Sequence, residues 1–159
     1  MDNVKKAEEV MEKLSNDDNL VTTTQIRRFL TAVNQVSGKV EKWKRDKKVG
    51  SHEALPEELQ AQIKYLKVKI AYTIGREKAS NKKSNNRSNQ KRSFTSVSDG
   101  REKTSNKKSN NPGKAELFFT ESDLLGIIDS IGSDIKKYEN FASYVEALVA
   151  FHKYYGGRD

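Results

Sequence analysis

The side chains that could perform catalytic chemistry are few and widely separated in this sequence. Its two histidines, His52 and His152, lie a hundred residues apart, and there is no cysteine to serve as a nucleophile, disulfide partner or zinc ligand. His152 falls on the apolar face of a helical pattern, which favours a hydrogen-bonded structural histidine over a catalytic base. His52 lies in a polar stretch beside Glu53 and is interpreted as solvated. We therefore expect a protein that is not an enzyme.

Carboxylates and glycines give no stronger signal for a metal or a nucleotide. Asp17 and Asp18 are adjacent in a loop, and Asp123 and Asp129 lie near a predicted helix start, where acidic side chains usually act as caps. Phosphate-cradling loops need clustered glycines between a strand and a helix, and that pattern is missing. We expect no metal site, no cofactor and no nucleotide hydrolysis.

Basic side chains on predicted helices, outside the apolar stripes, form the remaining candidate site. An ammonium or guanidinium group in such a place can reach successive phosphates of a nucleic acid through charge. Taken alone, such residues are more typical of a solvated face than of a nucleic-acid site. The candidate RNA-binding residues are Arg27, Arg28, Lys39, Lys64, Lys67, Lys69, Arg76 and Lys153.

The elements that carry these residues show helical periodicity. Apolar residues recur at spacings of three and four, whereas alternation with period two is not sustained. The pattern predicts an all-α fold, a compact bundle of about five helices near residues 4–14, 22–47, 56–76, 120–131 and 134–155.

Local signals set the expected helix starts and the packing of one helix. Thr22 with Gln25, and Thr120 with Asp123, have the spacing of capping pairs, and Pro56 suits the first turn of the third helix. That third helix has two apolar stripes on nearly opposite sides, which predicts that it is sandwiched between neighbours. The stripes are Leu59, Ile63, Leu66, Ile70 and Ile74, and Tyr65, Val68 and Tyr72.

A polar, basic linker separates the third helix from the fourth. The chain has a formal net charge of +8, and residues 76–114 hold 12 basic and 3 acidic residues, so the remainder is close to neutral. The sequence of residues 75–86 recurs at 100–111 with Thr104 in place of Ala79, which indicates a tandem duplication. Because the linker is poor in apolar groups, we expect disorder over about 78–114. We interpret 1–159 as one helical domain, interrupted at about 77–114.

Hydropathy argues against a membrane protein. The N-terminus leads into an amphipathic stretch, and no segment approaches the ~20 apolar residues that span a bilayer. We expect a cytoplasmic protein with no membrane partner.

Two separated passages resemble the small-subunit family of Csm-type, type III-A CRISPR complexes. They are LVTTTQIRRFL from Leu20 to Leu30 and FASYVEALVAFHKYYGG from Phe141 to Gly157. Between them, QIKYLKVKIAY from Gln62 to Tyr72 resembles the central basic helix of that family. The resemblance covers 1–75 and 115–159, whereas the duplicated linker departs from the family pattern.

The resemblance implies a non-catalytic helical subunit that binds crRNA and target RNA and scaffolds a filament in antiviral defence. Its implied partners are the crRNA-binding backbone subunit, the large polymerase-like subunit and further copies of itself along the filament. Two alternatives stay open at this point. One is an unrelated helical nucleic-acid-binding regulator, and the other is a pure protein-interaction module whose basic residues only solvate the surface.

Overall fold

The computed structural model describes residues 2–48, 53–90 and 111–158. These ranges contain no strand, and one isolated antiparallel bridge joins Ala54 to Asp134. The all-α prediction is confirmed, with six helices in the described ranges instead of the five expected. They are α1 (Asn3–Asn16), α2 (Thr23–Lys47), α3 (Glu57–Gln90), α4 (Lys114–Glu121), α5 (Leu124–Ile131) and α6 (Ile135–Tyr154).

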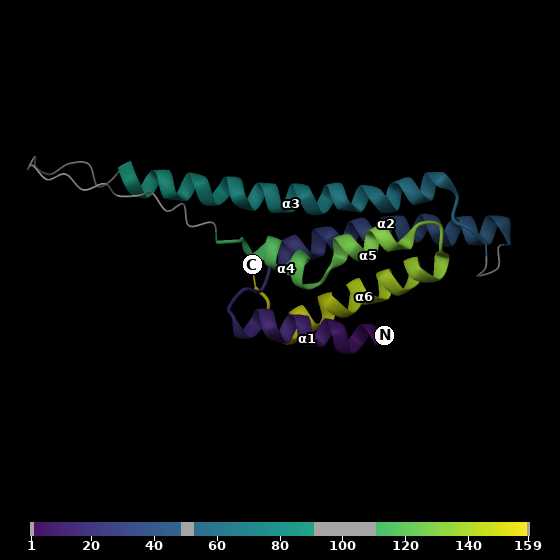
Figure 1. Cartoon of the computed structure of the whole chain (residues 1–159), viewed down its shortest axis with the longest axis horizontal. Coiled ribbons are helices and arrows are strands. Elements are labelled where there is room, and N and C mark those ends of the chain that lie inside the picture. Colours follow the sequence, from purple (N-terminus) through teal and green to yellow (C-terminus); the bar gives the residue numbers. More distant parts are fainter. Residues whose placement is uncertain (1, 49–52, 91–110, 159) are drawn as a thin grey trace, which may run out of the picture.

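The helices are arranged around α2 and α6 (Figure 1). α1 packs on α6, α6 packs on α2, and α2 runs beside α3, while α4 and α5 contact α3, and α5 also contacts α6. Aromatic side chains are the largest in the centre, and each buries a large apolar area. The largest fully buried side chains include Tyr138, Tyr144, Phe118, Phe119 and Phe141. None of the helices in the described ranges combines the length and apolar character that crossing a membrane requires.

The start and end of α2 follow the local sequence signals. The Thr22 hydroxyl accepts a hydrogen bond from the Gln25 amide at 3.2 Å, and the Gln25 side chain accepts from the Thr22 amide at 3.1 Å. This reciprocal capping box satisfies amides that the first turn leaves without partners. Lys48, in the left-handed region at φ 51°, ends the helix. The expected range of 22–47 is confirmed.

The segment before α6 differs from the expectation. Thr120 does not cap a helix; it lies inside α4, which begins at Lys114 and buries Phe118 and Phe119. The Ser122 hydroxyl donates to the Phe118 carbonyl at 2.6 Å, and Asp123, at φ 53°, separates α4 from α5. Burial of two adjacent phenylalanines therefore outweighed the local capping pattern, which is why one expected helix became two.

α3 is longer than its apolar stripe predicted, because it continues to Gln90 instead of ending near Arg76. The disorder expected from residue 78 is therefore contradicted over 78–83, where α3 continues and the side chains are described. Contacts with α4 hold the first part of this extension: the Glu77 carboxylate accepts from the Ala115 amide at 2.9 Å, and the Lys78 ammonium lies 3.0 Å from Glu116. The rest of the linker, over 91–110, lies outside the described residues.

The two apolar stripes of α3 have different environments. Leu59, Ile63, Leu66 and Ile70 are buried against the core. The second stripe is not covered, since Tyr65, Val68 and Tyr72 are 56%, 51% and 64% exposed. The prediction that α3 is sandwiched is therefore wrong for the single chain.

Candidate nucleic-acid interface

A groove runs between α2 and α3 and contains two pockets placed end to end. Their volumes are about 450 and 550 Å³, and Lys69 lines both of them. The first lies near the start of α2, and the second lies near the middle of that helix. We call this feature the α2–α3 groove, and its charged and aromatic lining consists of Arg28, Lys39, Glu58, Tyr65, Lys69, Tyr72, Arg76, Glu77 and Phe29.

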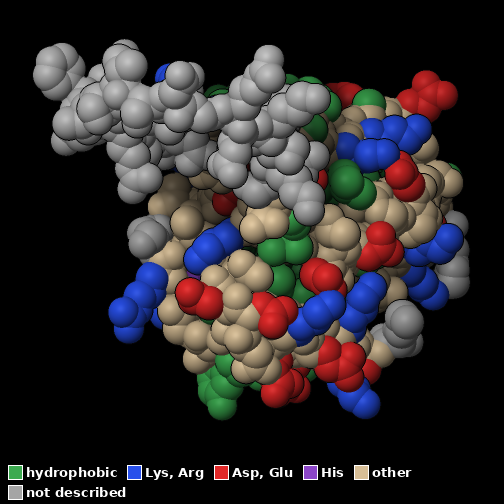
Figure 2. Space-filling model, turned by 60° about the vertical axis from the view of Figure 1, so that its left-hand side comes forward, with side chains coloured by type: hydrophobic (Ala, Val, Ile, Leu, Met, Phe, Trp, Pro, Cys, Tyr) green, Lys and Arg blue, Asp and Glu red, His purple; other side chains and the backbone are tan. Residues whose placement is uncertain are grey.

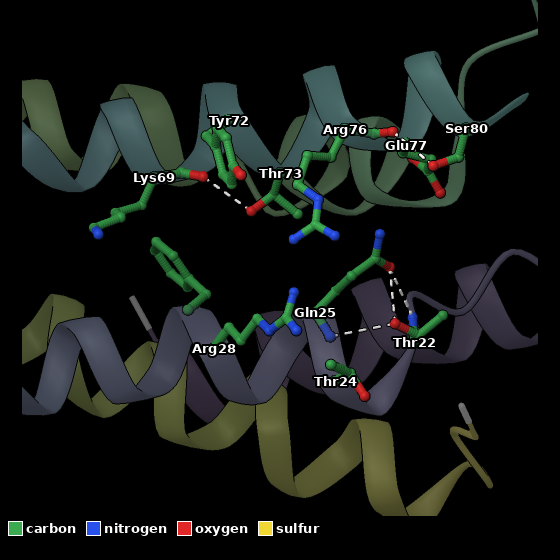
Figure 3. A pocket seen from close by; sticks show the side chains of 11 residues that line it. Thr22, Thr24, Gln25, Arg28, Lys69, Tyr72, Thr73, Arg76, Glu77 and Ser80 are labelled. Carbon is green, nitrogen blue, oxygen red and sulfur yellow. Dashed lines mark hydrogen bonds between the residues drawn. The ribbon is translucent and has the colours of Figure 1, made fainter. Parts of the chain in front are cut away.

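Four basic side chains converge on the α2–α3 groove from its two walls. Arg28 and Lys39 come from α2, and Lys69 and Arg76 come from α3. In Figure 3 the guanidinium groups of Arg28 and Arg76 point toward each other from the facing helices. Two like charges held close together raise the local positive potential, which attracts an anion.

These four cations are not neutralised by acids. Among the residues that the structure describes, no ion pair involves any of them. Lys39 donates to the neutral amide oxygen of Gln62 at 2.8 Å. Of the two acids in the lining, Glu77 accepts a hydrogen bond from the Ala115 amide. The groove therefore carries surplus positive charge.

Two exposed tyrosines border the same groove, and each lies under a basic group of α3. The Lys69 ammonium is 5.6 Å from the ring centre of Tyr65, and the Arg76 guanidinium is 5.8 Å from that of Tyr72. Both distances are within the range of a cation–π contact. The sequence predicted a covered stripe at these positions, so the tyrosines were missed as site residues. Their spacing of four residues from each cation was the available signal.

The other four candidate residues do not line the groove. The Lys67 ammonium pairs with Asp129 of α5 at 2.7 Å, on the flank of α3 away from α2. Lys64, one helical turn before it, is exposed. Arg27 and Lys153 are exposed on α2 and α6. The structure therefore brings together half of the eight predicted residues.

The start of α2, which lines one end of the groove, is held by the C-terminal tail. His152 is 2% exposed, and its Nε2 lies 2.5 Å from the Val21 carbonyl oxygen. The amide and hydroxyl of Thr23 donate to the carbonyls of Arg158 and Gly157, each at 3.3 Å. The two passages LVTTTQIRRFL and FASYVEALVAFHKYYGG thus meet in space, and the structural interpretation of His152 is confirmed.

Gly157 is required for this junction to close. A Cβ atom added at this position would overlap the His152 ring. The Gly157 amide also donates to the His152 carbonyl at 2.9 Å, so the tail folds back over the end of α6. Any side chain at 157 would displace either the histidine or the tail.

The acidic residues considered as metal ligands have structural positions. Asp17 caps the end of α1, Asp123 precedes α5, and Asp129 pairs with Lys67. Within the described ranges, no three histidine or acidic side chains gather as a metal site would require. His52 lies outside the described residues.

Basic and acidic side chains are mixed on one face of the molecule. On the face shown in Figure 2, basic and acidic side chains alternate around exposed apolar patches instead of forming one broad basic surface. This agrees with the near-neutral composition outside residues 76–114. Apart from the basic segment that follows Arg76, a polyanion would therefore be attracted at the groove and not by the body of the molecule as a whole.

Together these features describe a small helical protein with a positively charged groove between two long helices. A family model described as Csm2 Type III-A matches residues 1–86, more than half of the 159-residue chain. The chain belongs to this family, which confirms the resemblance seen in the sequence. It is thus a small subunit of a type III-A CRISPR complex, from a family of non-catalytic subunits. Comparison with curated proteins and with solved structures gave no match.

Proposed function

We propose that this subunit holds crRNA or target RNA by its phosphates in the α2–α3 groove, and scaffolds the type III-A complex without catalysing a reaction. The observation that carries the proposal is the convergence of Arg28, Lys39, Lys69 and Arg76, none of which is ion-paired within the described residues. Phosphate oxygens would complete the hydrogen bonds of these groups and neutralise their charge.

The described surroundings of the groove support a binding role instead of a catalytic one. The buried histidine is occupied by the Val21 carbonyl, and the nearest acid of the first pocket, Glu77, is engaged by α4. Besides Glu58, the groove offers basic groups, hydroxyl groups and aromatic rings. Such a surface retains a polymer by electrostatic attraction and contact area.

Scaffolding is proposed from family membership together with the open surface of the chain. The partners would be the crRNA-binding backbone subunit, the large polymerase-like subunit and further copies of this chain, in the cytoplasm. Arg27, Lys64, Lys67 and Lys153 would be outer contacts to RNA or to these subunits. A pure protein-interaction module is the second candidate, favoured by the exposure of Tyr65, Val68 and Tyr72.

The test uses the reconstituted complex with guide-matched RNA across a salt series. Lys69→Glu with Arg76→Glu should lower RNA affinity at least about tenfold, and should reduce the steepness of the salt dependence by roughly 0.7 for each lost contact to a single strand. Lys136→Glu with Lys137→Glu is the matched control, because both lysines are exposed on α6 and do not line the groove. Wild-type affinity and slope in the groove variant, with normal incorporation, would contradict RNA binding and favour the protein-interaction module.

A further inference from the structure

The exposed aromatic rings on α3 are not needed by a site that binds phosphate through charge alone. Phosphates can be held by lysine and arginine alone, yet Tyr65 and Tyr72 place more than half of their surface in solvent beside the groove. Contiguous exposed apolar surface of this kind marks an interaction site more often than chance. The question is what these rings contact.

The rings belong to a repeated unit. Tyr65 is followed four residues later by Lys69, and Tyr72 is followed four residues later by Arg76, with each cation over its ring. The two units are seven residues apart on one helix, which is a separation of about 10.5 Å at 1.5 Å per residue. Both therefore face the same side of α3.

Each unit is completed by a cation from the opposite wall. Tyr72, Arg76 and Arg28 line the first pocket, and Figure 3 shows the last two reaching into it from α3 and α2. The second pocket is lined by Tyr65, Lys69 and Lys39. We call each such set a station: one exposed tyrosine, the basic group of α3 over its ring and one basic group from α2. Lys69 lines both pockets, and the first pocket also contains the buried Phe29.

We propose that each station binds one nucleotide of a single-stranded RNA, with its base stacked on the tyrosine ring and its phosphate held by the facing cations. This inference rests on the proposed function of the groove and deepens it. An aromatic face is a sequence-tolerant platform for a base, worth roughly 5- to 150-fold in affinity. A basic group over the other face of the ring leaves one face open to the base.

A single strand fits these features better than a duplex or a protein. Bases in a duplex are covered on both faces by their stacked neighbours, so a tyrosine ring could stack on one only after that base had left the helix. An extended single strand can present separated, unstacked bases. A protein partner would not need a basic group paired with each ring on both walls.

The experiment measures binding of the full chain to a CA-repeat RNA of about 20 nucleotides, single-stranded or annealed to its complement. Tyr65→Leu with Tyr72→Leu keeps apolar side chains but removes the rings. We expect affinity for the single strand to fall at least about 25-fold, affinity for the duplex to change less than about twofold, and the salt dependence to stay as in the wild type. Fluorescence of a 2-aminopurine base in the single strand should be quenched by the wild type and not by the variant.

Tyr154→Leu is the matched control, since Tyr154 is 77% exposed on α6 and does not line either pocket. Lys69→Gln with Arg76→Gln should weaken binding to both RNA forms. If only these lysine and arginine changes weaken binding, the stacking inference is overturned and the phosphate groove stands. If neither pair has an effect, or the wild type binds no RNA, both proposals fail. Unchanged RNA binding with loss of assembly in the tyrosine variant would assign the rings to a protein contact and overturn the inference.

Discussion

The two flanks of α3 carry the same types of basic residue in different surroundings. On the flank toward α4 and α5, Lys67 lies 2.7 Å from Asp129 and Lys78 lies 3.0 Å from Glu116. On the flank toward α2, Lys69 and Arg76 meet tyrosine rings and an open groove. The neighbouring helices make this difference, because α4 and α5 present acids to α3 whereas the groove wall of α2 presents arginine, lysine and amides.

This comparison separates basic residues that fasten the fold from those available to a ligand. An exposed ion pair contributes about 0–1 kcal/mol to stability, so the paired flank gains little, but its charge is already neutralised. The groove flank keeps its charge for an incoming anion. A count of lysines and arginines along α3 does not distinguish these two groups of basic residues. The acids on the neighbouring helices distinguish them.

The largest expected effect concerns the hydrogen bond by which α6 holds α4 and α5, the helices that carry the acids facing α3. Tyr144 of α6 donates to the Ser122 carbonyl at 3.1 Å, between α4 and α5, and burial, with a smaller contribution from Asp123, raises the pKa of Tyr144 to about 12. Because the folded-state pKa is raised, this stabilisation is full below pH 10 and is lost as the pH rises through about 12. We expect the free energy of unfolding to fall by about 2 kcal/mol from this group.

Chemical denaturation at several pH values between 9 and about 12 measures this loss. Tyr144→Phe removes the ionisable group and one hydrogen bond, so it should be less stable than the wild type at pH 8 by about 1 kcal/mol and should show a shallower decline at high pH. A variant with the same decline as the wild type would show that folding does not raise the pKa of Tyr144.

The second prediction concerns acids placed across from the basic residues of the groove, so that those residues gain ion-pair partners while every lysine and arginine is kept. Gln25→Glu with Gln35→Glu places two acids in the groove wall formed by α2, and glutamate at 25 keeps the capping box. RNA affinity of the assembled complex should fall at least about tenfold, because the new carboxylates neutralise the cations and repel phosphate. Asn34→Asp with Asn140→Asp, at exposed positions outside the groove, is the charge-matched control. Equal losses in the two variants would point to net charge instead of the groove.

The third prediction concerns the duplicated segment. Deletion of residues 76–100 joins Gly75 to Arg101-Glu102-Lys103, so the arginine of the groove flank and the residues that contact α4 are replaced by their repeat copies. The connection from this point to Ala115 becomes about threefold shorter, which should change stability by about 1 kcal/mol or less, in the stabilising direction. Calorimetry measures the change in stability, and RNA affinity measures whether the repeat copy of the arginine replaces Arg76 in the groove. A midpoint lowered by more than ~10 °C would mean that the removed part of α3 packs on the core.

The smallest expected effect concerns the ion pair between Lys67 and Asp129, on the flank of α3 toward α4 and α5. A double-mutant cycle with Lys67→Gln and Asp129→Asn should give a coupling of about 0.5 kcal/mol, since both side chains are more than a third exposed. Neither change should alter RNA affinity more than about twofold. A larger loss of RNA on Lys67→Gln would place this flank in the interface as well.

The amino-acid sequence alone determined the all-α class, the limits of α2 and α6, and the structural role of His152. These follow from local rules, because capping pairs, left-handed ends and apolar periodicity act over a few residues and hold in almost any packing arrangement. Family membership was also visible in the sequence, in the passages from Leu20 to Leu30 and from Phe141 to Gly157. Four of the groove residues could also be nominated from the sequence, because the helical pattern shows which basic residues lie beside an apolar stripe.

Only the tertiary structure decided which basic residues face a groove and which face an acid. Lys67 and Lys69 are two positions apart on one helix, so they lie on different flanks. Lys67 pairs with Asp129 of α5, whereas Lys69 faces the groove whose other wall is α2. The division of the fourth expected helix at Asp123 and the exposure of Tyr65 and Tyr72 were decided in the same way. Each depends on contacts between residues far apart in the chain, and local periodicity contains no information on which helix lies across from which flank.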